Sequence, residues 1–141
     1  MRRLLTICLL ALAAVLVAAP ATPAAGAPAP TITRVKPMRV SVGNLLTITG
    51  TRFKAQRSRN TVIFRGPNGR IAFAKPSRAT TRKLVVRVPA AVARLLRVSD
   101  SRQRPTRLKL RVLSGKFSKF TPRRLSPVVT GVGGGDGGGD G

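Results

Sequence analysis

The sequence predicts an all-β domain that folds as a sandwich of two sheets. Apolar and polar residues alternate at a period of two in short runs along the middle of the chain, which is the pattern of half-buried strands. Turn-forming residues interrupt these runs about every 8 to 12 residues. Apolar residues make up 43% of the 141 residues, so the chain can build a packed core although its net charge is +24.

The first expected strand lies at residues 45–50. One of its faces carries Leu46, Ile48 and Gly50, and the other carries mainly threonine. Because successive side chains of a strand point to opposite faces, the first set is expected to turn inward. The Gly50-Thr51-Arg52-Phe53 segment that follows is expected to bring Phe53 into the same core.

The next two runs are expected to form a hairpin. Val62 and Phe64 repeat the two-residue spacing, and Ile71 and Phe73 repeat it after a break. The break, Gly66-Pro67-Asn68-Gly69, has turn chemistry, because proline presets φ and Asn or Gly tolerates a positive φ. A strand on each side of this turn follows.

Two later rows and one short helical segment complete the pattern. The rows are Leu84, Val86 and Val88, ending at Pro89, and Leu108, Leu110 and Val112, ending at Ser114-Gly115. Only residues 90–96 have helical spacing, and we expect them to cross over between the sheets. About seven short strands with little helix describe a β-sandwich of immunoglobulin-like build. Its expected core contains Ile48, Phe53, Phe64, Val86, Leu110 and Val112.

Residues 1–21 are expected to be a secretory signal peptide. Arg2 and Arg3 form a positive start, residues 4–19 are almost entirely apolar, and Ala19-Pro20-Ala21 has the small residues that signal peptidase accepts. The apolar run is shorter than the roughly 20 residues that span a bilayer. Cleavage would place the protein outside the cell or on its surface, with no transmembrane segment left. An uncleaved anchor is the alternative.

The remaining chain divides by composition into three parts. Residues 22–30 are a Pro/Ala-rich spacer, residues 31–129 carry the alternation, and residues 130–141 are expected to be a flexible, disordered Gly/Asp-rich tail. Asp136 and Asp140 supply too few oxygen ligands, on too flexible a segment, for a calcium site. Only the middle part is expected to fold.

From Pro30 onward the order of residues resembles the IPT/TIG domain family, which has an immunoglobulin-like fold. Gly50-Thr51-Arg52-Phe53 matches the Gly-x-x-Phe corner that closes the second strand of that family. Asn60-Thr61-Val62-Ile63-Phe64 resembles the following strand. Leu84-Val85-Val86-Arg87-Val88-Pro89 resembles the family's strand that ends in proline.

The resemblance covers residues 30–129 and implies a binding or spacer module rather than an enzyme. The chain departs from the family at Gly43-Asn44, where paired glycines are usual, and at a basic insert, residues 100–105. In exported bacterial proteins such modules are often followed by Asp-rich, calcium-binding repeats, and residues 133–141 resemble a lead-in to them. The first functional expectation is therefore a non-catalytic structural spacer, secreted or held at the cell surface.

The composition argues against catalysis. The chain has no histidine and only 3 acidic residues, so the groups that do general acid and base chemistry near neutral pH are scarce. Ser114 with Lys116 is a formal nucleophile pair, but no acid is present to orient a base. We expect no catalytic residue, no cofactor and no bound metal.

The charge predicts an alternative function, the binding of polyanions. If the Leu108 row faces the core, Arg107, Lys109 and Arg111 face outward about 6.7 Å apart. Their repulsion is only partly screened at that distance, and a bound polyanion would relieve it. Arg65 and Arg70 bracket the hairpin and join this face if that strand pairs nearby. The ligand would be an anionic envelope polymer, a lipid headgroup or extracellular nucleic acid, and a merely solvated face is the remaining alternative.

No specific nucleic-acid partner is expected. The sequence offers no helix for the major groove and no aromatic platform on which bases could stack. Charge alone still gives nonspecific affinity for nucleic acid. The expected partner is therefore an anionic envelope polymer or another protein.

The signal segment yields the first testable prediction. The exported protein is expected to begin near Thr22, because cleavage after Ala21 follows from the small residues at that point. N-terminal sequencing of material recovered outside the cytoplasm measures this. Recovery only from the cytoplasm with Met1 intact would contradict export.

Overall fold

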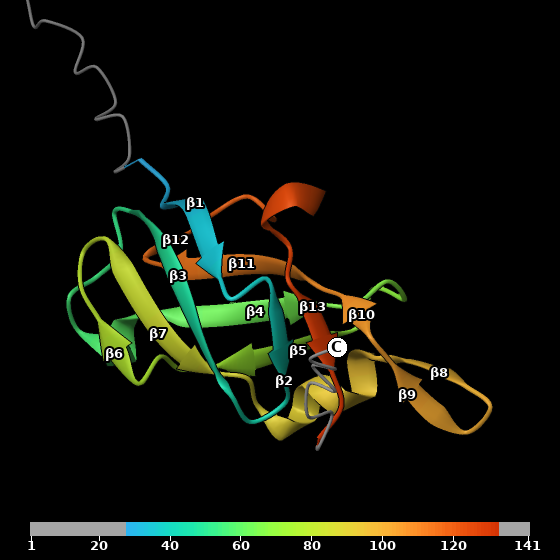
Figure 1. Cartoon of the computed structure of the whole chain (residues 1–141). Coiled ribbons are helices and arrows are strands. Elements are labelled where there is room, and N and C mark those ends of the chain that lie inside the picture. Colours follow the sequence, from blue (N-terminus) through green and yellow to red (C-terminus); the bar gives the residue numbers. More distant parts are fainter. Residues whose placement is uncertain (1–27, 133–141) are drawn as a thin grey trace, which may run out of the picture.

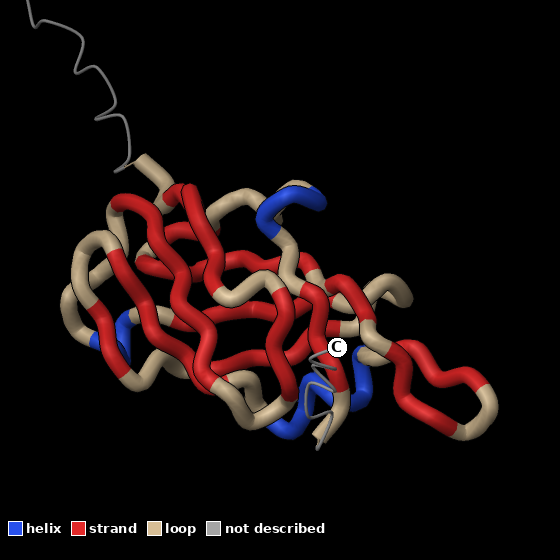
Figure 2. The backbone as a smooth tube through the Cα atoms, in the orientation of Figure 1, coloured by secondary structure: helices blue, strands red, loops and turns tan. Residues whose placement is uncertain are grey.

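The computed structural model describes residues 28–132, which form two packed β-sheets with the core between them (Figure 1). The expected signal peptide, most of the spacer and residues 133–141 lie outside the described residues. Strands dominate, and the helical segments are short turns between strands (Figure 2). They are η1 (Arg57–Arg59), η2 (Ala90–Leu95) and η3 (Arg123–Leu125). None of the helices within residues 28–132 has the length and apolar character needed to cross a membrane.

The first sheet is antiparallel and has the strand order β1-β3-β7-β6. Its strands are β1 (Thr31–Lys36), β3 (Leu45–Thr51), β6 (Arg78–Ala79) and β7 (Lys83–Arg87). In β3, Ile48 lies opposite Val35 of β1 and Leu84 of β7. All three side chains are buried, so this row faces the second sheet.

The second sheet has the order β12-β11-β4-β5 and supplies the other half of the core. Its strands are β4 (Thr61–Arg65), β5 (Ile71–Ala74), β11 (Lys109–Ser114) and β12 (Lys116–Phe117). Leu110 of β11 lies opposite Phe64 of β4, and Val112 lies opposite Val62. These four side chains are fully buried.

Two smaller sheets extend the sandwich. The first has the order β10-β13-β2, and contains β2 (Arg39–Ser41), β10 (Thr106–Arg107) and β13 (Val128–Thr130). The second is a hairpin of β8 (Arg97–Ser99) and β9 (Arg102–Arg104) that projects from the sandwich (Figure 1). Asp100 and Ser101 form its turn at positive φ. The basic insert expected at residues 100–105 is therefore part of this arm.

The core confirms the expected strand phases. The six side chains proposed from the sequence are buried in one cluster: Ile48, Phe53, Phe64, Val86, Leu110 and Val112. The described chain forms more and shorter strands than the expected seven, because several runs are interrupted. The run through Leu108, for example, is divided between β10 and β11, and the Leu108 N–H donates to the Pro127 carbonyl at 3.0 Å.

The expected hairpin is present, but its returning strand buries a different residue. Gly66-Pro67-Asn68-Gly69 joins β4 to β5. Ala72 faces the core, whereas the larger Ile71 and Phe73 are exposed. Residues 90–96 contain the expected helical connection, a 3-10 segment that follows β7.

The corner after β3 requires glycine. A Cβ at Gly50 would overlap the carbonyl oxygen of Thr31 and stand 2.7 Å from Cζ of Phe53. Arg52 takes a positive φ of 62°, and the chain then returns Phe53 to a buried position. The Gly-x-x-Phe segment therefore works as one unit, in which the missing side chain makes room for the ring.

Asn60 ties the loop after this corner to the second sheet. Its Nδ2 donates to the carbonyls of Lys54 and Gln56, at 2.7 and 2.9 Å. Its Oδ1 accepts from the Lys54 N–H at 3.0 Å and from the Ser114 hydroxyl at 2.7 Å. The side chain is fully buried with these bonds satisfied, so β4 begins at a fixed point.

Gly50→Ala is expected to lower the free energy of unfolding by about 1 to 3 kcal/mol, because the added methyl group overpacks the corner. Urea denaturation measures the loss. Thr49→Ala, on the same strand, is the matched control and should cost less than about 1 kcal/mol. Equal losses for the two variants would show that the corner does not require a residue without a side chain at position 50.

Candidate anion-binding site

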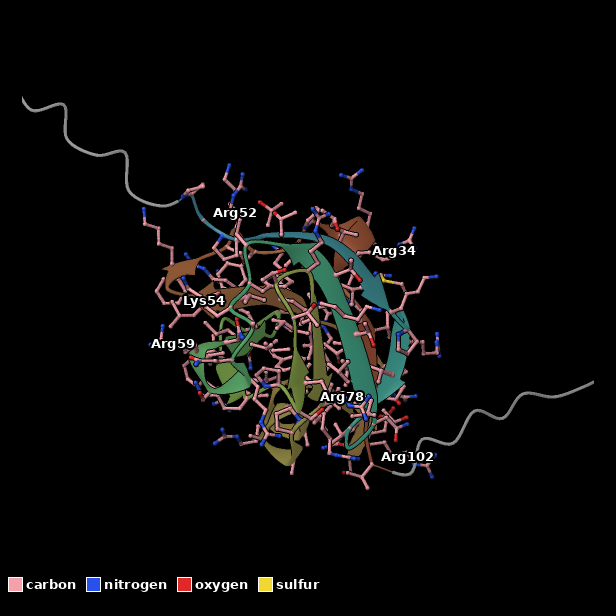
Figure 3. The ribbon with its side chains drawn as sticks, turned by 90° about the vertical axis from the view of Figure 1, so that its left-hand side faces the viewer. Arg34, Arg52, Lys54, Arg59, Arg78 and Arg102 are labelled. Atoms are coloured by element: carbon pink, nitrogen blue, oxygen red, sulfur yellow. The ribbon has the colours of Figure 1, made fainter. Side chains whose placement is uncertain are left out.

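The charged side chains on the surface of the described chain are almost all cationic. Basic side chains point outward on several sides of the molecule, as the labelled Arg34, Arg59 and Arg78 show in Figure 3. Asp100 is the single acidic residue between positions 28 and 132. It pairs with Arg104 at 3.1 Å on the projecting arm, where both side chains are exposed. The other cations therefore have no carboxylate partner within residues 28–132.

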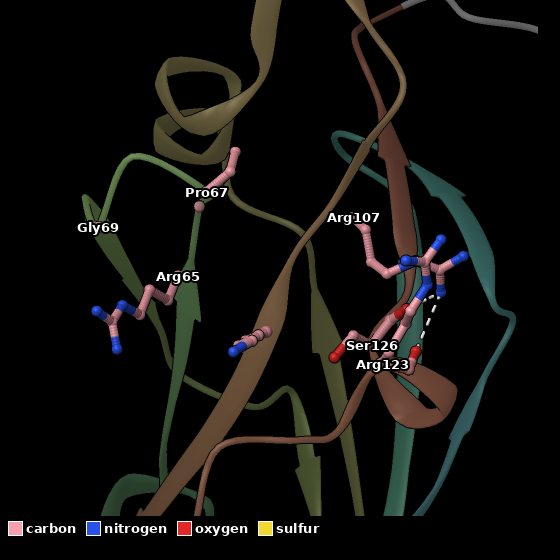
Figure 4. Close-up of a pocket in the computed structure, with 8 residues that line it drawn as sticks. Arg65, Pro67, Gly69, Arg107, Arg123 and Ser126 are labelled. Atoms are coloured by element: carbon pink, nitrogen blue, oxygen red, sulfur yellow. Dashed lines mark hydrogen bonds between the residues drawn. The ribbon is translucent and has the colours of Figure 1, made fainter.

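A hollow of about 360 Å³ gathers several of these cations beside the tip of the β4–β5 hairpin (Figure 4). We call it the basic hollow, and it is lined by Arg65, Gly66, Pro67, Gly69, Arg107, Lys109, Arg123 and Ser126. Four of these residues are basic and none is acidic. Three of them, Arg65, Arg107 and Lys109, belong to the face predicted from the sequence.

The pairing of β4 with β11 brings two of the cations together. Arg65 lies directly opposite Lys109 in the antiparallel register, so their Cβ atoms are about 5 Å apart on one face. Like charges in this position repel each other. The register thus puts Arg65 on the same outward face of the sheet as Lys109, as the binding hypothesis requires.

Arg107 reaches the basic hollow while its guanidinium holds the turn η3. Its Nη1 donates to the Ser126 carbonyl at 2.7 Å and to the Arg123 carbonyl at 3.2 Å. A guanidinium has five N–H donors, and these two bonds use only one nitrogen. In Figure 4 the Arg107 and Arg123 side chains extend on the Ser126 side of the hollow, and Arg65 extends on the other side.

Arg123 is the functional candidate that the sequence analysis missed. It lies outside the alternating runs, in η3, and only the folding of that turn against Arg107 brings it to the hollow. No local pattern distinguishes it from its neighbour Arg124. Only the three-dimensional structure therefore identifies Arg123 as a lining residue.

The segment after β12 is held to the edge of β11 by side-chain hydroxyls. The Val112 N–H donates to the Ser118 hydroxyl at 2.9 Å, and the Ser118 N–H donates back to the Val112 carbonyl at 2.8 Å. Thr121 repeats this exchange with Leu110, at 2.9 and 2.8 Å. These bonds fix residues 118–121 beside the cationic face.

Arg111 lies on the same face as Lys109 but outside the lining of the hollow. Its Nε donates to the Ser118 carbonyl at 2.7 Å. Its Cζ lies 4.3 Å from the ring centre of Phe117 and 5.1 Å from that of Phe120. Arg65 also lies over Phe120, at 5.3 Å. Aromatic side chains therefore accompany the cations here, with a guanidinium over each ring.

Arg70 does not join this face. Arg65 lies opposite Ile71 in the hairpin, so the residue before Ile71 has the opposite phase. Arg70 lines a separate hollow with Ile71, Arg94 and Leu95. Of the five residues predicted to bind polyanions, three line the basic hollow, Arg111 flanks them, and Arg70 lies elsewhere.

The hydroxyl of Ser114, the formal nucleophile of the Ser114 and Lys116 pair, is occupied by hydrogen bonds to other residues. The Ser114 hydroxyl is buried and donates to Asn60. It also accepts from the Lys54 N–H at 2.8 Å. Ser114 thus stabilises the loop between β3 and β4, which contains Lys54 and Asn60.

Two packed antiparallel sheets with a Gly-x-x-Phe corner define an immunoglobulin-like module. The family model for the IPT/TIG domain matches residues 30–111, and the chain belongs to this family. IPT/TIG domains are generally non-catalytic modules. A search of the curated proteins found no match.

Solved structures support the same fold. The chain is similar to a structural genomics protein of unknown function from Bacteroides thetaiotaomicron VPI-5482, with a TM-score of 0.56 and 15% sequence identity. The match covers 74% of this chain and 22% of that protein. This chain therefore spans about a fifth of the length of the protein that it resembles.

Arg107→Ser is expected to lower the Tm, because it removes two hydrogen bonds, one to η3 and one to the residue that follows it, a loss of about 1 to 2 kcal/mol. Lys109→Ser should leave the Tm equal or higher, because it relieves the repulsion with Arg65. Differential scanning calorimetry of the two variants measures both effects. A Tm that falls equally in both would show that the two cations have the same structural role.

Proposed function

We propose that this chain is an exported IPT/TIG module that binds phosphate-bearing anions of the cell envelope through the basic hollow. The observation that carries the proposal is the convergence of four basic side chains, from β4, β10, β11 and η3, on one hollow with no acidic lining residue. A bound polyanion would relieve the repulsion that this arrangement creates.

The chemistry of the lining favours phosphate or a similar oxyanion. Arg65, Arg107 and Arg123 supply planar guanidinium groups, which bind such oxyanions through paired N–H donors. Lys109 adds a point charge to the same lining. Recognition of this kind depends on charge and has little preference for the sequence of a polymer.

A structural spacer is the second candidate function. The similar solved protein is several times longer than the matched region, because the match covers only 22% of it. A module of this kind within a longer product would separate other parts from the envelope. In that case the basic hollow would have no ligand.

Binding to linear inorganic polyphosphate at several salt concentrations distinguishes the two functions. The triple variant Arg65→Ser, Lys109→Ser and Arg123→Ser should lower the slope of log K against log salt by about two to three units, at about 0.7 to 0.9 for each lost phosphate contact. Arg107 is left intact because it holds η3.

The control removes the same charge from elsewhere, by Arg34→Ser, Arg78→Ser and Arg82→Ser, all at exposed positions. It should change the slope by less than about one unit. A control that matched the hollow variant would show that net charge alone binds polyphosphate. If the triple variant of the hollow kept the original salt slope, the binding function would be wrong and the spacer function would be favoured.

A further inference from the structure

The outer face of the second sheet carries apolar side chains next to its cations. Of the chain's 5 phenylalanines, Phe53 and Phe64 are buried in the core. Phe73 and Phe117 are 58% and 46% exposed, and Ile71 is 44% exposed. Exposed apolar side chains that share one face of a sheet with cations suit an interaction surface that is partly apolar and partly charged.

The strand register places charge in the middle of this face and apolar groups at its edges. Arg65 lies opposite Lys109 on one side and opposite Ile71 on the other. Phe73 belongs to the edge strand β5, and Phe117 belongs to the opposite edge strand β12. The cations of β4 and β11 thus lie between two apolar borders.

Ile63, in the middle of the face, is shielded from water by its neighbours. It lies opposite Arg111 in one direction and opposite Phe73 in the other. Although it points away from the main core cluster, it is only 5% exposed. A surface that is already partly desolvated is a suitable base for an apolar contact.

We propose that this outer face docks onto a bilayer that contains anionic phospholipids. The inference rests on the proposed function, since lipid phosphates would occupy the basic hollow. A bilayer interface offers phosphates at the headgroup level and hydrocarbon just below. A soluble polymer of phosphates would satisfy the cations but leave Ile71, Phe73 and Phe117 in water.

The ring contacts favour lipid over single-stranded nucleic acid. Base stacking needs an open ring face, and Arg111 already covers one face of Phe117 and one of Phe120, at 4.3 and 5.1 Å. Insertion into the headgroup region needs no open ring face. A second copy of this chain is disfavoured as the occupant, because it would bring another strongly cationic surface against this one.

The absence of tryptophan from the sequence allows a direct test. Phe73→Trp places a single fluorophore on the outer face, and Leu45→Trp places one at an exposed position of the first sheet. The protein beginning at Thr22 keeps the whole sandwich and is used for both. Vesicles of phosphatidylglycerol and phosphatidylcholine should shift the emission of the Phe73→Trp variant to shorter wavelength and leave that of the Leu45→Trp variant unchanged.

Vesicle sedimentation measures the apolar contribution separately. The double variant Phe73→Ser and Phe117→Ser should reduce partitioning onto these vesicles about tenfold to a hundredfold. Its affinity for polyphosphate should stay unchanged. The matched control, Leu45→Ser with Val98→Ser, removes two exposed apolar side chains elsewhere and should retain vesicle binding. Thermal melts confirm that each variant is folded.

The outcomes separate this inference from the proposed function. Equal emission shifts at both reporter sites, or vesicle binding that survives the double phenylalanine change, would overturn membrane docking while polyphosphate binding could still depend on the hollow. Quenching of the Phe73→Trp variant by poly(dT), with tighter binding than to vesicles, would replace lipid with single-stranded nucleic acid. If the triple variant of the hollow bound polyphosphate as well as the original protein does, the proposed function itself would be overturned.

Discussion

The pairing of the outer edge of β11 is the constraint on which the cationic face depends. β12 pairs only with the last two residues of β11, so the rest of that edge needs other partners. Ser118 and Thr121 supply them, each with a hydroxyl that accepts and a backbone N–H that donates. A buried N–H without a partner costs about 1 to 3 kcal/mol. These two side chains therefore allow the irregular segment of residues 118–121 to cover the edge of β11 without leaving a buried N–H unpaired.

The same bonds determine what stands on the outer face. Because Ser118 is fixed, its carbonyl holds the Arg111 guanidinium. Phe117, just before Ser118, and Phe120, two residues after it, then lie against the same guanidinium. Arg65 reaches Phe120 from the neighbouring strand. The hydroxyls that close the sheet thus also order the cations and rings that we propose meet the ligand.

The sequence predicted the sandwich and its buried rows because a period of two states which residues share a face. It could not choose the buried face where apolar residues are consecutive, as in Ile71-Ala72-Phe73, since packing against η2 and the opposite sheet decides there. For the same reason the sequence could not show that Arg70 lies away from the face that carries Arg65. Arg123 could not be predicted, because its place depends on a turn with no periodicity.

The scarcity of acidic residues gives the surface its capacity for anions. Several cations are oriented by neutral backbone carbonyls, as Arg107 is by Ser126, Arg111 is by Ser118 and Arg87 is by Gly43. A carbonyl fixes the direction of a guanidinium but does not cancel its charge. A carboxylate would do both, and an incoming anion would then have to displace it. Orientation without neutralisation leaves ordered positive charge available, which lowers the reorganisation needed when an anion binds.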